Sequence, residues 1–258
     1  MARTAMRITT KISIRLLVIC LLASVLVASA RRQNAGFFGS NAAPAAANKI
    51  SVKSCVGGGV YSGTTATVNI SPTNGDTVVS GIYAVSANAP ASNFTSFQDN
   101  NSNNLTQDNS GWINVASHNA DLTWFHISNV SSLTDVKITF GANQIIAMVV
   151  CDLSGVVNTS PVDVADNTGA TWSGITASSG AITTLNNNDI VLGLFGDTTG
   201  GKTYSTKSPW TVGYSEDQSG SIDAAISYQI VSTATGYTPE ATVTSISGNG
   251  LSMSYKSQ

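Results

Sequence analysis

The sequence predicts an all-β fold, a two-sheet antiparallel β-sandwich of jelly-roll type preceded by a helical signal peptide. Short stretches of alternating apolar and polar residues are separated by Gly, Asn, Ser and Pro, as expected of strands joined by turns. After the first thirty residues no stretch combines a 3.6-residue hydrophobic period with helix caps. Charged residues make up only 10% of the chain, and the polar positions are largely Ser, Thr, Asn and Gly, which are poor helix formers.

The first thirty residues have the layout of a secretory signal peptide. Residues 1–15 carry four positive charges, an uncharged apolar run follows, and Ala-Ser-Ala at 28–30 has the small residues of a cleavage site. Only fifteen uncharged residues separate Arg15 from Arg31, fewer than the roughly 20 that a membrane-spanning helix needs. We therefore expect cleavage after Ala30, a secreted or cell-surface location and no membrane span in the mature protein.

Two further segments follow the leader. Residues 31–48 are rich in Ala, Asn and Gly and predict a flexible linker. Residues 49–258 are expected to form a single β-sandwich domain, which is long enough to bury a substantial core.

The charge balance excludes one class of partner. After removal of the leader, eight Lys and Arg residues remain against fourteen Asp and Glu, so the net charge is about −6. Binding to phosphates needs clustered Lys and Arg, whereas the eight here are scattered. We therefore predict no binding to nucleic acid.

Eleven segments show a strand pattern, and their order has no βαβ rhythm. Val136, Ile138 and Phe140 share one face of their strand while the residues between them are polar, so that strand covers a core with one side. Residues 145–150 and 190–195 are apolar on both faces, which indicates central strands that are covered on both sides. The expected strands are 49–54, 64–70, 76–85, 112–117, 122–127, 133–140, 144–153, 189–195, 222–231, 241–246 and 251–256.

Several stretches occur in a recognisable order along residues 49–258. They are NGDTVVSGIYAV, TWFHISNV followed by VKITF, AMVVCDLSGV, NNDIVLGLFG and the closing ATVTSISGNGLSMSYKS. Together they resemble a β-sandwich domain found in exported bacterial surface proteins of unassigned function. The resemblance implies a fold and an exported location and supplies no catalytic residues. Leu153 departs from it, since similar proteins carry an aromatic residue there.

Two cysteines remain after Cys20 is removed with the leader. Cys55 and Cys151 could form one disulfide in an oxidising compartment. The alternative is a pair of buried free thiols, because Cys packs as a small hydrophobic residue.

Calcium is the one cofactor hypothesis that the sequence suggests. Asp99, Asn101 and Asn103 have the alternating spacing of a calcium loop, although the Gly and Glu expected later in such a loop are missing. A second candidate is DVADNTG at residues 163–169, with Asp163, Asp166 and Asn167. The alternative for both is an ordinary polar loop.

No residue pattern predicts catalysis. His118 and His126 are eight residues apart, outside the common zinc-ligand spacings, and the chain has no G-x-S-x-G nucleophile motif. Glu216, Asp217 and Asp223 are the nearest approach to the carboxylate pair of a glycosidase, but the glycines around them indicate a turn between strands. We therefore predict a protein that is not an enzyme.

Four tryptophans are candidates for stacking against sugar rings. Trp124 lies in an apolar strand and is expected in the core with the residues around it. Trp172 and Trp210 are flanked by Gly, Ser and Pro and are the candidate ligand-binding residues, with a role as buried loop anchors as the alternative.

These observations predict a secreted or cell-surface, non-catalytic binding or adhesion protein. Its expected partner is an extracellular glycan or a surface protein, contacted by the long polar loops 86–110 and 196–221. One alternative is a glycoside hydrolase or lyase of jelly-roll fold. Another is a structural subunit of a surface assembly that pairs through exposed strand edges.

Overall fold

The computed structural model describes residues 50–258 except 116–117, 219 and 245–246. These residues belong to a compact unit that spans Ala47–Gln258. The predicted signal peptide and linker lie outside the described residues. Within the described part, no helix has the length and apolar character needed to cross a membrane.

The unit is built from antiparallel sheets, which confirms the all-β prediction. Its helical residues in the described part include the 3-10 turn η1 (Ser86–Asn88) and the short helix α2 (Pro90–Asn93). The seven-stranded sheet contains β1 (Ser51–Asn69), β2 (Thr77–Val85), β3 (Phe94–Asp99), β4 (Thr106–Gln107), β5 (Ile113–Val115), β6 (Ala120–Ile127) and β7 (Asp135–Ser154).

The six-stranded sheet contains β8 (Val162–Ala165), β9 (Ala170–Ser173), β12 (Ile190–Asp197), β14 (Thr211–Gln218), β15 (Ile222–Ile230) and β18 (Ser247–Tyr255). Two smaller sheets contain β10 (Thr176–Ser178), β13 (Tyr204–Ser205) and β17 (Glu240–Val243), and β11 (Ile182–Thr183) with β16 (Gly236–Tyr237). The order in the main sheets is β1-β7-β2-β6-β4 and β14-β15-β12-β18-β8.

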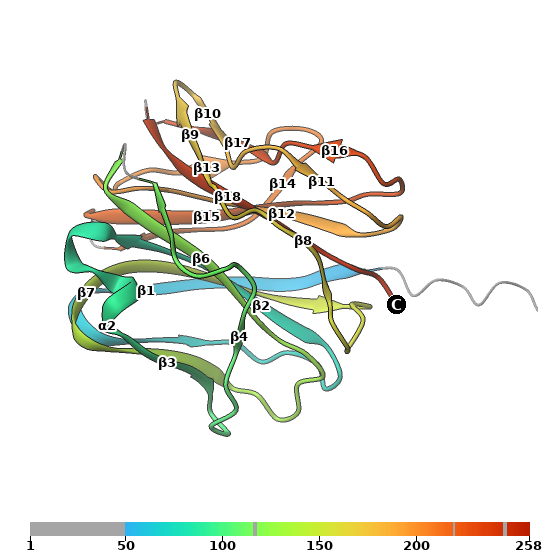
Figure 1. Ribbon diagram of the computed structural model, residues 1–258, viewed down its shortest axis with the longest axis horizontal. Coiled ribbons are helices and arrows are strands. Elements are labelled where there is room, and N and C mark those ends of the chain that lie inside the picture. Colours follow the sequence, from blue (N-terminus) through green and yellow to red (C-terminus); the bar gives the residue numbers. More distant parts are fainter. Residues whose placement is uncertain (1–49, 116–117, 219, 245–246) are drawn as a thin grey trace, which may run out of the picture. The chain divides into compact units, whose positions relative to one another are not determined.

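The two large sheets face each other across the main core (Figure 1). Trp124 and Val149 of the seven-stranded sheet pack in one cluster with Leu192 and Met253 of the six-stranded sheet. The outer face of each large sheet is covered as well. The small sheets cover β12 and β15, where Phe195 packs with residues of β13 and β17.

The outer face of the seven-stranded sheet is covered by its own longest strands. Val136 and Ile138 from the first half of β7 lie in the same core cluster as Met148 and Val150 from its second half. A Cβ atom on Gly58 would lie 2.8 Å from a methyl group of Val68, although both residues belong to β1. β1 and β7 therefore bend back together over the sheet to which they belong.

This arrangement explains the segments that are apolar on both faces. Strand β12 is buried along its whole length, and the residues of β7 from Ile146 to Leu153 are buried as well. Both strands thus have a core on each side, as predicted. The sequence segments 49–54 and 64–70 were expected as separate strands, but they are the two ends of the single strand β1.

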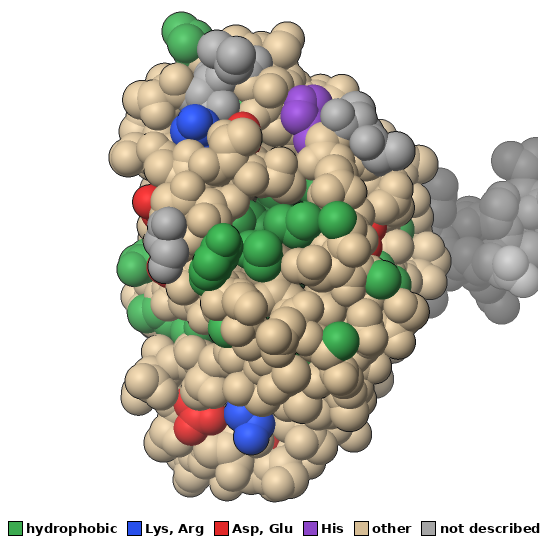
Figure 2. Space-filling model, turned by 90° about the vertical axis from the view of Figure 1, so that its left-hand side faces the viewer, with side chains coloured by type: hydrophobic (Ala, Val, Ile, Leu, Met, Phe, Trp, Pro, Cys, Tyr) green, Lys and Arg blue, Asp and Glu red, His purple; other side chains and the backbone are tan. Residues whose placement is uncertain are grey.

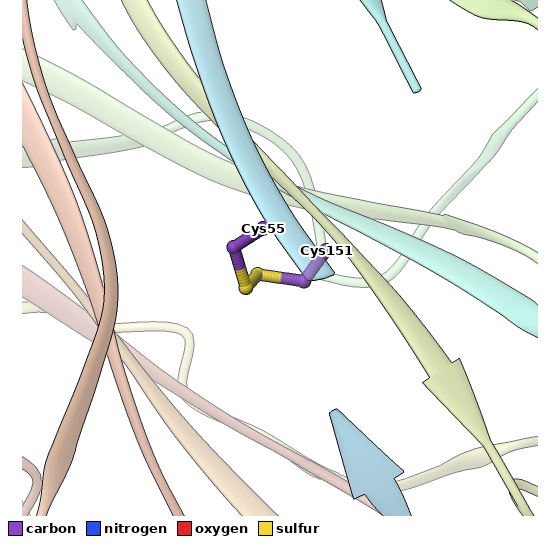
Figure 3. The surroundings of a disulfide bond; sticks show 2 residues. All are labelled: Cys55 and Cys151. Carbon is purple, nitrogen blue, oxygen red and sulfur yellow. A yellow bond between two sulfur atoms is a disulfide. The ribbon is translucent and has the colours of Figure 1, made fainter. Parts of the chain in front are cut away.

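Cys55 and Cys151 form a disulfide between neighbouring strands (Figure 3). They are directly paired residues of β1 and β7. Gly213, at a bulge in β14, packs against this bridge, since a Cβ atom there would lie 2.7 Å from the Cys55 sulfur. The bridge therefore joins two strands of one sheet at the point where a strand of the other sheet crosses them.

We predict that removing the bridge with C55A/C151A lowers the free energy of unfolding by about 2–5 kcal/mol, because the unfolded chain then loses its cross-link. Urea unfolding of the wild type with and without reductant checks the effect. The double variant is the control, and its midpoint should not respond to reductant. Equal midpoints for the wild type in both conditions would contradict the prediction.

Candidate functional site

The two tryptophans predicted to bind ligand are buried. Trp172 is 6% exposed and packs with Phe195 and Tyr204, and Trp210 is 4% exposed and packs with Val191. The prediction of an exposed stacking platform at these residues is therefore wrong. The small sheets that cover β12 enclose both rings, which the flanking Gly and Ser residues did not indicate.

The first predicted calcium loop is a hydrogen-bonded turn. The Asp99 carboxylate accepts bonds from the backbone amides of Asn101 (2.9 Å) and Asn103 (2.7 Å) and from the side-chain amide of Asn103 (2.8 Å). N–H groups rather than oxygens therefore surround this carboxylate. The three residues stabilise the end of β3 and do not form the oxygen-lined cage that calcium needs.

The three residues of the second predicted calcium loop have different hydrogen-bond partners. Asp166 accepts a bond from the backbone amide of Thr168 (2.8 Å), and Asn167 accepts one from the backbone amide of Ser110 (2.7 Å). Asp163 instead accepts a bond from the backbone amide of Leu185 (2.7 Å). The three residues therefore bond to three different parts of the chain: Asp163 to the segment before β12, Asp166 to its own turn and Asn167 to the loop at Ser110.

The two histidines lie in different polar clusters. His126 bonds to Asp108, whose second carboxylate oxygen accepts the Tyr255 hydroxyl at 2.5 Å. His118 is half-buried and lies 3.5 Å from the side-chain nitrogen of Asn249. Each histidine links a loop to a strand of a main sheet.

A groove with a volume of about 250 Å³ lies between β3 and β4. We call it the β3–β4 groove. Its lining residues are four apolar ones and four polar ones: Phe94, Phe97, Leu105 and Phe125, with Thr95, Ser96, Asn104 and Gln107.

Aromatic rings form the floor of the β3–β4 groove. The ring centroid of Phe125 lies 5.6 Å from that of Phe94 and 5.2 Å from that of Phe97. Phe97 and Phe125 are almost fully buried, whereas Phe94 is half-buried. Trp112 supports Phe94 from the side at 6.3 Å. Phe94 therefore offers a fixed, partly accessible apolar surface.

The side-chain amides of Asn104 and Gln107 line the groove beside these aromatic rings. Asn104 accepts a bond from Gln98 at 3.0 Å, and Gln107 donates one to Thr123 at 2.8 Å. Within the described residues these bonds leave the Asn104 side-chain nitrogen and the Gln107 side-chain oxygen for other partners. No charged side chain lines the groove. The arrangement can hold a neutral molecule that has one apolar face and several hydroxyl groups.

A β-bulge in β3 explains why the sequence pattern did not predict this groove. Phe94 and Phe97 pair with Phe140 and Ile138 of β7, and Thr95 between them has no direct partner. The extra residue places the two phenylalanines on one face although they are three apart in the chain. The predicted contact segment 86–110 supplies all of the lining residues except Phe125, and its phenylalanines, rather than a tryptophan, provide the aromatic surface.

A second polar cluster is buried between the large sheets and the loop 198–203. Asp223 accepts bonds from the Tyr204 hydroxyl (2.7 Å) and from the backbone amides of Asp197 (3.0 Å) and Lys202 (3.3 Å). Asp197 is its direct partner across β12 and β15. Burial raises the pKa of Asp223 to about 7 and the charge of Asp197 adds to the rise, while the three hydrogen bonds oppose it. These acids hold the loop in place.

No family model matches the chain, and no curated protein matches it. Among solved structures, the ANXUR1 extracellular domain from Arabidopsis thaliana is 7% identical, over 81% of this chain and 90% of that chain, with a TM-score of 0.24. An oxalate decarboxylase from Bacillus subtilis is 9% identical over 83% and 77%, with a TM-score of 0.19. A cupin 2 conserved barrel domain protein from Leptotrichia buccalis is 8% identical over 80% and 91%, with a TM-score of 0.18. At these scores the similarities carry no argument about this chain.

We predict that Asp223 makes the fold more stable in mild acid. A carboxyl whose folded pKa is raised binds its proton more tightly in the folded state, so stability falls as pH rises through about 7. The melting temperature should be higher by roughly 5 °C at about pH 5.5 than at about pH 8.5. Thermal unfolding across this range measures it.

The variant D223N should reduce this slope, because Asn does not titrate. Burial also raises the pKa of Asp189 to about 7 and that of Asp152 and Glu216, so part of the slope should remain. D217N is the matched control, since Asp217 faces Asp223 across β14 and β15 but is exposed. Equal slopes for wild type and D223N would refute the prediction.

Proposed function

We propose that this chain is an exported, cell-surface protein of the jelly-roll type that binds neutral extracellular carbohydrate in the β3–β4 groove and performs no catalysis. The observation that carries the proposal is the combination of a partly accessible Phe94 ring with the side-chain nitrogen of Asn104 and the side-chain oxygen of Gln107, which their own hydrogen bonds leave for a ligand. Sugars present an apolar C–H face and a rim of hydroxyl groups, and this combination is complementary to both.

The groove favours a single sugar unit. Its volume of about 250 Å³ is below the roughly 300–1,000 Å³ of pockets for drug-sized ligands. Its uncharged lining favours a neutral sugar over an acidic or amino sugar. The low charge of the chain, with charged residues making up only 10% of it, supports the same preference. Figure 2 illustrates this low charge on one face of the molecule.

The acids of the described part support a non-catalytic role. A glycosidase needs two carboxyl groups that face a sugar from opposite sides. Asp197 and Asp223 are adjacent, but both are buried and bonded to backbone amides, and no acid lines the β3–β4 groove. The chemistry at the groove is therefore recognition by packing and hydrogen bonding.

The test is a glycan array with the purified protein, with and without a metal chelator, followed by calorimetric titration of the best ligand. We expect binding to a neutral glycan, weakened about 10-fold by F94A, because a lost stacking contact costs about 1.4 kcal/mol. N104A removes an exposed donor without disturbing the core and should weaken binding several-fold. I175A is the control, since Ile175 is 71% exposed and outside the groove.

Three results would count against the proposal. Absence of binding to any glycan in either condition removes the carbohydrate function. Unchanged affinity in both F94A and N104A places the site elsewhere. Sedimentation of the protein as a polymer without glycan binding favours the structural-subunit alternative.

A further inference from the structure

Strand β1 forms one edge of the seven-stranded sheet. It stands at the end of the strand order β1-β7-β2-β6-β4, and among the described residues β7 is its only strand partner. From Ser54 to Tyr61 this pairing has no register shift, and the irregularities lie on either side of the run. Residues 54–61, which we call the β1 edge, therefore present a regular row of backbone N–H and C=O groups on their free side.

The cysteine pair shows which residues direct these groups outward. The Cα atoms of Cys55 and Cys151 are 4.1 Å apart. In an antiparallel ladder, opposite residues lie about 4.5 Å apart where they exchange no hydrogen bonds and about 5.5 Å apart where they do. Cys55 therefore directs its backbone N–H and C=O away from β7. The pattern repeats at every second residue, so Gly57, Gly59 and Tyr61 do the same.

The faces of the β1 edge are covered, whereas its free side is accessible. A Cβ atom on Gly57 would lie 2.5 Å from atoms of Tyr214 and Glu216 of β14. On the other face, a Cβ atom on Gly58 would lie 2.8 Å from a methyl group of Val68. Both glycines nonetheless remain partly exposed. Solvent therefore reaches them from the free side, and they have no side chain to hinder the approach of another backbone.

Other edge strands of the two large sheets have features that oppose pairing. Strands β4, β5, β8 and β9 have four residues or fewer. Strands β3 and β14 are longer, but each contains a bulge and an acidic residue. The β1 edge has neither, because its pairing with β7 is regular and no charged residue occurs between Lys53 and Asp76. Since native proteins protect long edges by such features, the β1 edge is the one suited to strand pairing.

We propose that the β1 edge pairs antiparallel with the β1 edge of a second copy of this chain, so that the two seven-stranded sheets become continuous. The outward-directed residues are spaced evenly about Gly58. A two-fold axis at Gly58 therefore pairs Cys55 of one copy with Tyr61 of the other. It likewise pairs Gly57 with Gly59, and each such pair exchanges two backbone hydrogen bonds.

The pattern of the β1 edge favours a second copy over a different partner. Its outward-directed residues are self-complementary under a two-fold rotation, which a foreign strand would not require. The chain has a net negative charge, so two copies repel each other least where charge is absent, as it is here. Tyr61 is 54% exposed at one end of this edge, and a second copy would cover part of its ring.

A two-fold contact of this kind is closed. Each copy uses its β1 edge once, so the expected species is a dimer and not a polymer. Strand β4 lies at the opposite end of the strand order, and no residue of the β3–β4 groove belongs to the β1 edge. The proposal therefore does not depend on carbohydrate binding.

The test combines analytical ultracentrifugation with hydrogen exchange of the wild-type protein over a concentration range of about 100-fold. We expect a monomer that converts to a dimer as concentration rises. In the dimer the amides of Gly57 and Gly59 should exchange about 10-fold more slowly, because they then donate hydrogen bonds. The amides of β14, which is an edge strand of the other large sheet, are the internal control and should not change.

The variant Y61K introduces the kind of charge that protects natural edges, and it should weaken dimerisation about 10-fold or more. Tyr61 is exposed, so the melting temperature of the monomer should change little. I230K is the matched control, because Ile230 is also an exposed strand residue, at 46%, and belongs to β15. This control should dimerise like the wild type.

The wild-type measurements alone can overturn the proposal, even if Y61K does not fold. A protein that remains monomeric at every concentration would contradict it. Slow exchange of Gly57 and Gly59 in a monomer would assign the edge to a segment of the same chain. A dimer in which these amides exchange as fast as in the monomer, or which Y61K does not weaken, would place the interface elsewhere.

Discussion

The return of β1 and β7 over their own sheet is the constraint on which the rest of this structure depends. β7 is twenty residues long, and its two halves contribute to one and the same core cluster. The first half of β7 packs over its second half. The face of the seven-stranded sheet that would meet solvent in a simple sandwich therefore becomes a second core. The disulfide between Cys55 and Cys151 fixes the register of the same two strands. Since β2 also pairs with β7, an error in this register would misplace the apolar residues of both cores.

The β3–β4 groove is a consequence of this return. β3 pairs with the first half of β7, whereas β4 pairs with β6 in the layer beneath. β3 and the segment before β4 are joined only by the Gln98–Asn104 bridge and neighbouring backbone bonds, and beyond that bridge the two strands pair with different strands. Rings of Phe94 and Phe125 fill its base because that base is the edge of the outer core. The accessible aromatic surface is thus supported by the core and does not depend on the conformation of a loop.

Local patterns were sufficient to predict the central strands and insufficient at their edges. The doubly apolar runs of β7 and β12 showed that both faces are covered, because burial on each side leaves no polar alternation. β14 was not predicted, since TVGYSEDQ is a half-exposed edge strand whose alternation is interrupted by the bulge at Gly213. A bulge at Thr95 also concealed that Phe94 and Phe97 share one face of β3, and another in β8 leaves Asp163 without a direct partner on β18. Each bulge adds a residue that the period of two cannot anticipate.

The acids show why spacing in the sequence was a poor guide to binding sites. Acids at turn spacing, such as Asp99 and Asp166, are close to backbone amides of their own turn, and those amides occupy their oxygens. In such a local motif, the backbone amides of the turn therefore tend to supply the hydrogen-bond donors for the acid. Asp189 is adjacent to a strand whose amides are committed to β15 and β18, so its partners come from other segments, namely the backbone of Ser257 and the carboxyl group of Asp163. The groups that meet a buried acid are therefore set by how the sheets bring distant segments together, which spacing in the sequence does not show.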